Sequence, residues 1–286
     1  MVKRRAMVVG GSGYVGQHLV PALRAAGWSV VATANKNSRN VPREPGVRVR
    51  LLDVSDPASV SRVLEREKPS VIINCSAARE ADQLGPVVVD GTRYLARASA
   101  AMGAVFVLLS TDNVFDGVRG WYGEDDPVCP VNAYGRAKAA AEEITLRLTP
   151  SSIIVRTSLV CGLEPLDPRS RWIVSALERG EVLRLFTDEL RCPVWVDELV
   201  SGVVEMIEGG LGGIMHLAGP ERLSRYDIGV ALGQHFGLAV DALIPSLASR
   251  YRSPRTLDGS LAIGRARNVL ETRLTGFRER LAPSPD

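Results

Sequence analysis

The first half of the chain alternates short apolar runs with longer amphipathic segments. The apolar runs are rich in Val and Ile and are short enough to be strands buried on both faces. The segments between them repeat their apolar positions with helical period. This order predicts βαβ units and a doubly wound parallel sheet. We expect strands at Ala6–Gly10, Val30–Ala34, Val47–Leu52, Ser70–Asn74, Val105–Ser110 and Ile153–Thr157, and helices at Gly13–Ala26, Pro57–Arg66, Val87–Met102 and Asn132–Leu148.

The second half of the chain does not continue this alternation. After Gly162 a stretch with Pro and Arg is followed by a short helix-like segment, Ile173–Arg179. The chain is therefore expected to leave the sheet and build a smaller C-terminal α/β lobe. A helix at Val196–Glu208 and a strand at Ile214–Leu217 are expected to return to the main domain. These boundaries give a main domain at 1–162 and 194–217, a lobe at 163–193 and 218–281, and a tail at 282–286.

Charge and cysteine usage exclude several classes of protein. The 286 residues carry 35 basic and 32 acidic side chains, and this mild, dispersed excess is not a nucleic-acid footprint, although it permits anionic small molecules. The cysteines are Cys75, Cys129, Cys161 and Cys192, and their wide spacing predicts neither a metal site nor a disulfide framework. The sequence has no signal-peptide pattern and no apolar stretch of membrane-spanning length. We therefore expect a cytoplasmic protein that binds no membrane and no metal.

A glycine-rich loop follows the first expected strand directly and opens a helix. Its glycines, Gly10, Gly13 and Gly16, have the spacing Gly-x-x-Gly-x-x-Gly. The first permits a tight turn, the second lets the backbone approach a pyrophosphate, and the third lets helix and strand pack closely. An ordinary glycine-rich turn is the alternative, but the βαβ context favours a dinucleotide site of Rossmann type. The expected coenzyme contacts in this loop are Gly10, Gly11, Ser12, Gly13, Tyr14 and Val15.

The end of the second strand suggests which dinucleotide binds. Lys36 and Arg39 follow Ala34 at the place where NAD-preferring proteins of this fold carry an acidic residue for the ribose 2′-hydroxyl. A basic side chain can instead hold a 2′-phosphate, which favours NADP(H), with NAD(H) left open. The alternative is that both are solvated loop charges.

Other residues at the carboxyl ends of the strands are candidates for the same site. Ligands of doubly wound sheets bind at this edge. Asp53 and Val54 follow the third strand, and Ser76, Ala77 and Ala78 follow the fourth. We expect all five to contact the coenzyme, with Asp53 near its adenine.

Tyr134 and Lys138 lie four positions apart in a segment of strongly helical composition. Residues at this spacing share one face of a helix. An ammonium group near a phenol lowers the phenol pKa, as a proton donor that must recover its proton requires. A surface Tyr and Lys on an amphipathic helix is the alternative. The position after the fifth strand favours a catalytic pair that also contacts the coenzyme.

Two hydroxyl groups, those of Ser110 and Thr111, lie at the carboxyl end of the fifth strand. A hydroxyl at this edge can donate to a substrate carbonyl oxygen and hold it against Tyr134. It could instead cap the following turn. We assign Ser110 to the coenzyme and Thr111 to catalysis and substrate binding.

Together these motifs resemble the extended short-chain dehydrogenases, and specifically the dTDP-4-dehydrorhamnose reductase branch. The resemblance covers nearly the whole chain. The glycine loop and the Tyr/Lys pair are shared by the wider superfamily, whereas other motifs are more specific. They are 110–117, 122–125 before Pro130, 156–160, 186–189, 191–197, 216–221 and 224–226.

The resemblance implies a reductase that transfers hydride from NADPH or NADH to the 4-keto group of a nucleotide sugar. Thr111, Tyr134 and Lys138 occupy its three catalytic positions, and Asp112, Asn113 and Val114 lie in its substrate loop. Arg191 and Arg225 lie in segments that resemble substrate-binding parts of the family. A guanidinium suits a diphosphate, so we expect these two arginines to bind it, unless they only tie the lobes together.

Three positions depart from the family pattern. Asn113 stands where a Tyr is common, Cys161 replaces another Tyr, and Asp90 replaces an Asn. The first two changes remove aromatic faces near the expected cleft. They affect the expected sugar more than the expected chemistry.

Two other functions compete with the reductase. One is a non-catalytic, dinucleotide-binding regulatory subunit, as in methionine adenosyltransferase, and the other is a nucleotide-sugar epimerase or dehydratase. Retention of Thr111, Tyr134 and Lys138 favours an enzyme over the regulatory subunit. The lack of an acidic ribose clamp weighs against the epimerase or dehydratase. The sequence leaves the substrate and the oligomeric state open, a homodimer included.

Overall fold

A computed structural model describes residues 4–78 and 80–282 of the chain. The chain forms two compact units, and it passes between them several times. The first unit contains residues 1–111, 133–156 and 200–215, and the second contains 112–132, 157–199 and 216–286. Of the expected tail at 282–286, residues 283–286 lie outside the described part of the chain.

A seven-stranded sheet organises the first unit. Its strand order is β11-β6-β5-β4-β1-β2-β3, and the neighbours from β5 to β3 pair in parallel. The order reverses beside β1, and ligands of such sheets bind outside the carboxyl ends of the strands at this point. The strands are β1 (Arg5–Val9), β2 (Ser29–Ala34), β3 (Val47–Leu51), β4 (Val71–Asn74), β5 (Val105–Thr111), β6 (Ile153–Thr157) and β11 (Gly213–Leu217).

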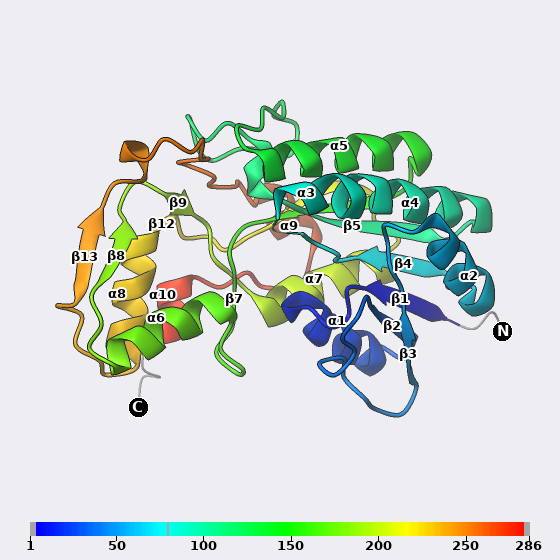
Figure 1. Ribbon diagram of the computed structural model, residues 1–286, viewed down its shortest axis with the longest axis horizontal. Helices are drawn as coiled ribbons and strands as arrows, with labels where there is room; N and C mark the ends of the chain where they lie inside the picture. The colour runs from blue at the N-terminus through cyan, green and yellow to red at the C-terminus, as the bar shows by residue number, and fades with distance from the viewer. Residues whose placement is uncertain (1–3, 79, 283–286) are drawn as a thin grey trace. The chain divides into compact units, whose positions relative to one another are not determined.

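Helices cover both faces of this sheet. α4 and α5 lie on one face, and α1 and α7 lie on the other (Figure 1). A buried apolar cluster, which includes Met7, Ile72 and Phe106, fills the space beneath α2, α4 and α5. The helices are α1 (Tyr14–Ala25), α2 (Pro57–Glu67), α3 (Ala81–Gln83), α4 (Gly91–Met102), α5 (Ala133–Leu148) and α7 (Val196–Glu208), with a π-helix at Leu84–Asp90.

The second unit is built from short strand pairs and its own helices. β8 and β13 pair in parallel, and β9 pairs antiparallel with β12. A separate apolar cluster, which includes Trp195, Leu232 and Phe277, forms the core. The elements are β7 (Val160–Cys161), β8 (Leu183–Phe186), β9 (Leu190–Arg191), β10 (Val194–Trp195), β12 (Leu223–Ser224), β13 (Leu243–Ser246), α6 (Pro168–Glu178), α8 (Arg225–His235), α9 (Gly264–Val269), α10 (Phe277–Leu281) and 3-10 turns at Asp112–Val114 and Ala248–Arg250.

The predicted α/β class and the predicted parallel sheet are confirmed. One helix differs in form, because a π-helix at Leu84–Asp90 precedes α4 where a continuous helix was expected from Val87. Pro86 has no N–H for an α-helical bond, and Gly91 N–H instead bonds the Pro86 carbonyl five residues back. The unit boundaries also differ from the predicted domains, since 112–132, 157–162, 194–199 and 216–217 belong to the second unit.

Among the described residues, no helix combines the length and apolarity needed to cross a membrane. Within the same residues, no group of three or more His, Cys, Asp or Glu side chains is placed to hold a metal ion.

Candidate active site

The glycine loop joins β1 to α1 in a conformation that requires glycine. Gly10 has a φ of +83°, and a Cβ there would lie 3.1 Å from the Cys75 carbonyl group. A Cβ at Gly16 would lie 2.3 Å from the Gly10 carbonyl oxygen, so only glycine lets α1 pack this closely on the loop. The N-cap residue of α1, Gly13, offers no side chain to the first-turn amides. The loop and helix therefore fit the pyrophosphate of a dinucleotide.

The first two basic residues after β2 lie at the surface. Lys36 and Arg39 are exposed, and no partner for either side chain is found among the described residues. The loop remains close to the glycine loop at its base, because Gly11 N–H donates to the Thr33 carbonyl oxygen at 2.7 Å.

The candidates at the ends of β3 and β4 are held by local hydrogen bonds. The Asp53 carboxylate accepts from Ser55 N–H at 3.0 Å and from the Ser55 hydroxyl at 2.6 Å. Asn74 accepts in the same way from Ser76, at 3.1 Å from its N–H and 2.6 Å from its hydroxyl. Val54 is buried, Ala77 is exposed and Ala78 packs against the core. These bonds fix the strand ends that border the expected adenosine site.

All three candidate catalytic residues belong to the first unit. Thr111 is buried at the end of β5, and Tyr134 and Lys138 lie one turn apart near the beginning of α5. Tyr134 is half-buried and packs against the core cluster. Lys138 is buried, and its Nζ donates to the Leu109 carbonyl oxygen at 2.8 Å. This bond fixes the lysine between α5 and β5.

Burial lowers the pKa of Lys138. Desolvation lowers the pKa of Lys138 to about 8, and the nearby Cys75 and Glu142 oppose this shift. Burial in turn raises the pKa of the Cys75 thiol to about 12. Lys138 therefore titrates close to physiological pH, as groups in catalytic sites often do.

Sequence reasoning missed the buried ion pair behind this lysine. Arg156 of β6 donates to Glu142 of α5 through Nε, at 3.1 and 3.2 Å, and through Nη2, at 2.8 Å. The Ser110 hydroxyl also donates to Glu142, so the serine assigned to the coenzyme has a protein partner. Glu142 follows Lys138 by four residues, and that spacing was a usable signal.

After Thr111 the chain enters the second unit, where Asp112 anchors the substrate loop. The buried Asp112 carboxylate accepts from the Ser158 hydroxyl at 2.7 Å and from Asn113 Nδ2 at 2.7 Å. It also pairs with Arg191 at 3.3 Å. Val114 is fully buried. Of the predicted substrate loop, Asn113 is the residue that stays half-exposed.

The two predicted diphosphate ligands have different surroundings. Arg191 is buried, pairs with Asp112, and donates to the Leu190 and Leu257 carbonyl oxygens at 2.7 and 3.3 Å. Arg225 lines a cavity of about 390 Å³ within the second unit. Arg191 does not line it. Arg191 is thus held by protein groups on several sides, whereas Arg225 pairs with Glu189 and borders the cavity.

Arginines outnumber carboxylates around this cavity. Its charged lining consists of Arg169, Arg184, Arg225, Arg255, Asp167 and Glu189. Asp167 is engaged as the N-cap of α6, and Glu189 pairs with Arg225 at 2.9 Å and with Arg255 at 3.5 Å. The side chains of Arg169 and Arg184 have no partner among the described residues. The lining also contains Cys161, Trp172 and Phe186, so aromatic faces are present although Cys161 replaces one.

The Asp90 departure has a local explanation. Its carboxylate pairs with Arg93 across one helical turn at the junction of the π-helix and α4.

The glycine loop, the parallel sheet and the Thr111, Tyr134 and Lys138 set define an extended short-chain dehydrogenase. A family model described as the RmlD substrate binding domain matches residues 4–284. The chain therefore belongs to this family, and the predicted family assignment is confirmed.

Three known proteins resemble this chain in sequence or in structure. The dTDP-4-keto-6-deoxy-D-glucose reductase of Streptomyces niveus is 31% identical over 78% of this chain and 76% of its own length. Methionine adenosyltransferase 2 subunit beta of Xenopus laevis is 26% identical over 85% of this chain and 75% of its own. The dTDP-4-dehydrorhamnose reductase of Bacillus anthracis, solved in complex with NADP, has a TM-score of 0.85, 22% identity and 98% coverage of both chains.

Proposed function

We propose that this protein is an NADPH-dependent reductase of a keto-sugar nucleotide, with NADH as a poorer coenzyme. The observation that carries the proposal is the retention of Thr111, Tyr134 and Lys138 in one compact unit with the glycine loop. The similarity to the Streptomyces niveus reductase supports the substrate class. The regulatory-subunit and epimerase or dehydratase alternatives are not favoured.

The first unit would hold the coenzyme through the backbone of its glycine loop. A bound nicotinamide coenzyme supplies the hydride. The first-turn amides of α1 would hold the pyrophosphate, and the end of β3 at Asp53 would border the adenosine. The four cysteines are unpaired, which supports a reducing compartment such as the cytoplasm.

Tyr134 would donate the proton that the reduced carbonyl oxygen needs. Thr111 would hold that oxygen through its hydroxyl at the end of β5. The ammonium of Lys138, fixed on the Leu109 carbonyl, would stabilise the negative charge that develops on Tyr134 as its proton leaves. The same ammonium would hold the ribose next to the nicotinamide.

The second unit would bind the anionic part of the substrate. Its arginine-lined cavity contains two guanidinium groups for which the described residues provide no partner, Arg169 and Arg184, beside the paired Arg225. Planar guanidinium donors match diphosphate oxygens. We assign the diphosphate to this cavity, with Arg225 as its predicted ligand.

The test is consumption of NADPH with a panel of keto-sugar nucleotides. Tyr134→Phe removes one hydroxyl and is expected to lower turnover by about two to four orders of magnitude, with coenzyme affinity retained. Thr111→Val should lower turnover without changing the fold. Full turnover in Tyr134→Phe would disprove the proton-donor role. Tight NADPH binding without reduction of any substrate, together with co-purification of another enzyme, would favour the regulatory subunit.

A further inference from the structure

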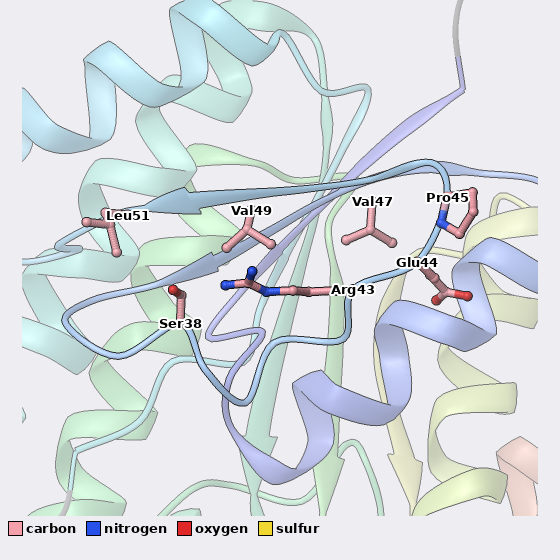
Figure 2. Close-up of a pocket in the computed structure, with 7 residues that line it drawn as sticks. All are labelled: Ser38, Arg43, Glu44, Pro45, Val47, Val49 and Leu51. Carbon is pink, nitrogen blue, oxygen red and sulfur yellow. The ribbon is translucent and has the colours of Figure 1, made fainter.

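The loop between β2 and β3 forms a groove of about 620 Å³ on the first unit (Figure 2). Ser38, Arg43, Glu44 and Pro45 line it from the loop. Val47, Val49 and Leu51 line it from β3, as alternate residues of an edge strand do on one face. None of these seven residues belongs to the predicted coenzyme, catalytic or substrate set.

The loop that carries Arg43 is held at several points. Val41 is buried, and its N–H donates to the Ser38 carbonyl oxygen at 3.1 Å. Val47 N–H closes a second turn on the Glu44 carbonyl oxygen at 3.1 Å. Arg24 of α1 donates to the Pro45 carbonyl oxygen at 3.0 Å. Arg43 therefore projects from a segment whose two ends are fixed.

The Arg43 guanidinium points along the groove toward Ser38, whereas the Glu44 carboxylate lies at the opposite end (Figure 2). No hydrogen bond or ion pair of the Arg43 side chain is found within the described residues. Among the described basic residues of the segment 35–46, Arg43 lines the groove and Lys36 and Arg39 do not. Arg43 is thus a cation directed toward a hydroxyl, with the carboxylate of the next residue at the other end of the groove.

The groove begins where the adenosine ribose of a dinucleotide is expected. Ala34 and Leu51, the last residues of β2 and β3, are register partners, and Leu51 lines the groove. The glycine loop contacts the same strand end through Gly11 and Thr33. A pyrophosphate on the glycine loop therefore directs the attached ribose toward the segment after β2.

We propose that Arg43, with Ser38, holds the 2′-phosphate of the coenzyme and so selects NADPH over NADH. The inference rests on the proposed function and moves the selectivity from Lys36 and Arg39 to a residue nine positions beyond the end of β2. All three side chains are exposed, but Arg43 lines the groove, where its planar fork can form directed bonds to a phosphate, and Lys36 and Arg39 do not line it. The apolar row on β3 lines the same groove.

The experiment compares three variants that each remove one positive charge from the same loop: Arg43→Ala, Lys36→Ala and Arg39→Ala. Affinities for NADPH, NADH, adenosine 2′,5′-bisphosphate and adenosine 5′-monophosphate are measured by fluorescence titration or calorimetry. Arg43→Ala should weaken NADPH and the bisphosphate at least about tenfold and change the other two ligands by less than about twofold. The two control variants should lose less than about threefold on NADPH. Arg43→Lys should be intermediate, because it keeps the charge but not the planar fork.

Three results would overturn the assignment: a loss in Arg43→Ala no larger than in the controls, an equal loss of NADH, or a parent protein that prefers NADH. A parent that prefers NADH yet reduces keto-sugar nucleotides removes the Arg43 inference and leaves the reductase in place. A parent that discriminates through Arg43 but reduces nothing retains the inference and removes the reductase.

Discussion

In the first unit Arg156 and Glu142 form a closed ion pair, whereas in the second unit Glu189 pairs with Arg191, Arg225 and Arg255. Burial alone would raise the pKa of Glu189, but these three guanidinium groups together hold that pKa below its usual value. The first arrangement balances its charges. The second leaves positive charge in excess beside a cavity.

This difference in charge balance fits the two proposed functions of the units, proton transfer in the first and anion binding in the second. A proton-transfer site needs one cation of adjustable charge in a fixed geometry, and the balanced pair would leave Lys138 for that proposed role. An anion site needs positive charge that the protein itself does not neutralise, because the ligand must supply the missing negative charge. The four predictions below test this comparison, beginning with the largest effect.

Lys138→Met should lower turnover by about two to four orders of magnitude and weaken coenzyme binding, because one ammonium serves both. The same variant should gain stability at pH 7, by about 1–2 kcal/mol, because the folded chain keeps the Lys138 charge buried at a lowered pKa of about 8. Between about pH 8 and the ordinary lysine value the unfolded parent holds a proton on Lys138 that the folded parent has lost, so the stability of the parent should rise with pH relative to that of Lys138→Met. Denaturant titrations across this range would show the stability difference between the parent and Lys138→Met shrink, whereas the difference between the parent and the exposed Lys68→Met control should change little.

Glu142→Gln should lower the free energy of unfolding by about 3 kcal/mol, since it leaves the buried Arg156 without its counter-charge. Glu181→Gln is the matched control, because its pair with Arg179 is exposed, and no measurable change is expected. Chemical denaturation measures both. Equal changes in the free energy of unfolding of the two variants would mean that the buried pair contributes no more to stability than the exposed one.

The pH profile of the parent should reflect Lys138. The ammonium is present below its pKa of about 8, so kcat/KM should fall as pH rises through that value, to about one-tenth at pH 9. Lys138→Arg keeps its charge and should move this limb to higher pH. A limb that stays in place in Lys138→Arg would assign it to another group.

The sequence predicted the sheet well because each strand is an apolar run, as Val30–Ala34 and Ile153–Thr157 are, and burial on both faces dictates that composition. The first residue of a helix was harder to predict where only an N-cap residue marks it. α6 begins at Pro168, after the capping residue Asp167, and not at Ile173 as expected. The catalytic candidates were found because Tyr134 and Lys138 are close in sequence.

Contacts between distant segments could not be predicted in this way. Arg169, Arg184 and Arg255 come from α6, β8 and a C-terminal loop, and each looks like an ordinary surface charge in the sequence. Arg43 was overlooked because its role depends on how the loop turns back toward β3. The roles of the site residues, including Arg191 and Ser110, remain predictions that substitution must test.

The smallest predicted effect separates the two arginines first assigned to the diphosphate. Arg225→Lys should raise KM for the keto-sugar nucleotide by about three- to tenfold with coenzyme affinity unchanged, because lysine keeps the charge in the cavity but loses the planar fork. Arg191→Lys should lower the thermal midpoint and leave KM unchanged, because Arg191 is committed to Asp112 and to backbone carbonyls. The exposed Arg252→Lys is the control for both. If Arg191→Lys raised KM while Arg225→Lys did not, the diphosphate would belong beside Asp112, and the excess charge around the cavity in the second unit would need another ligand.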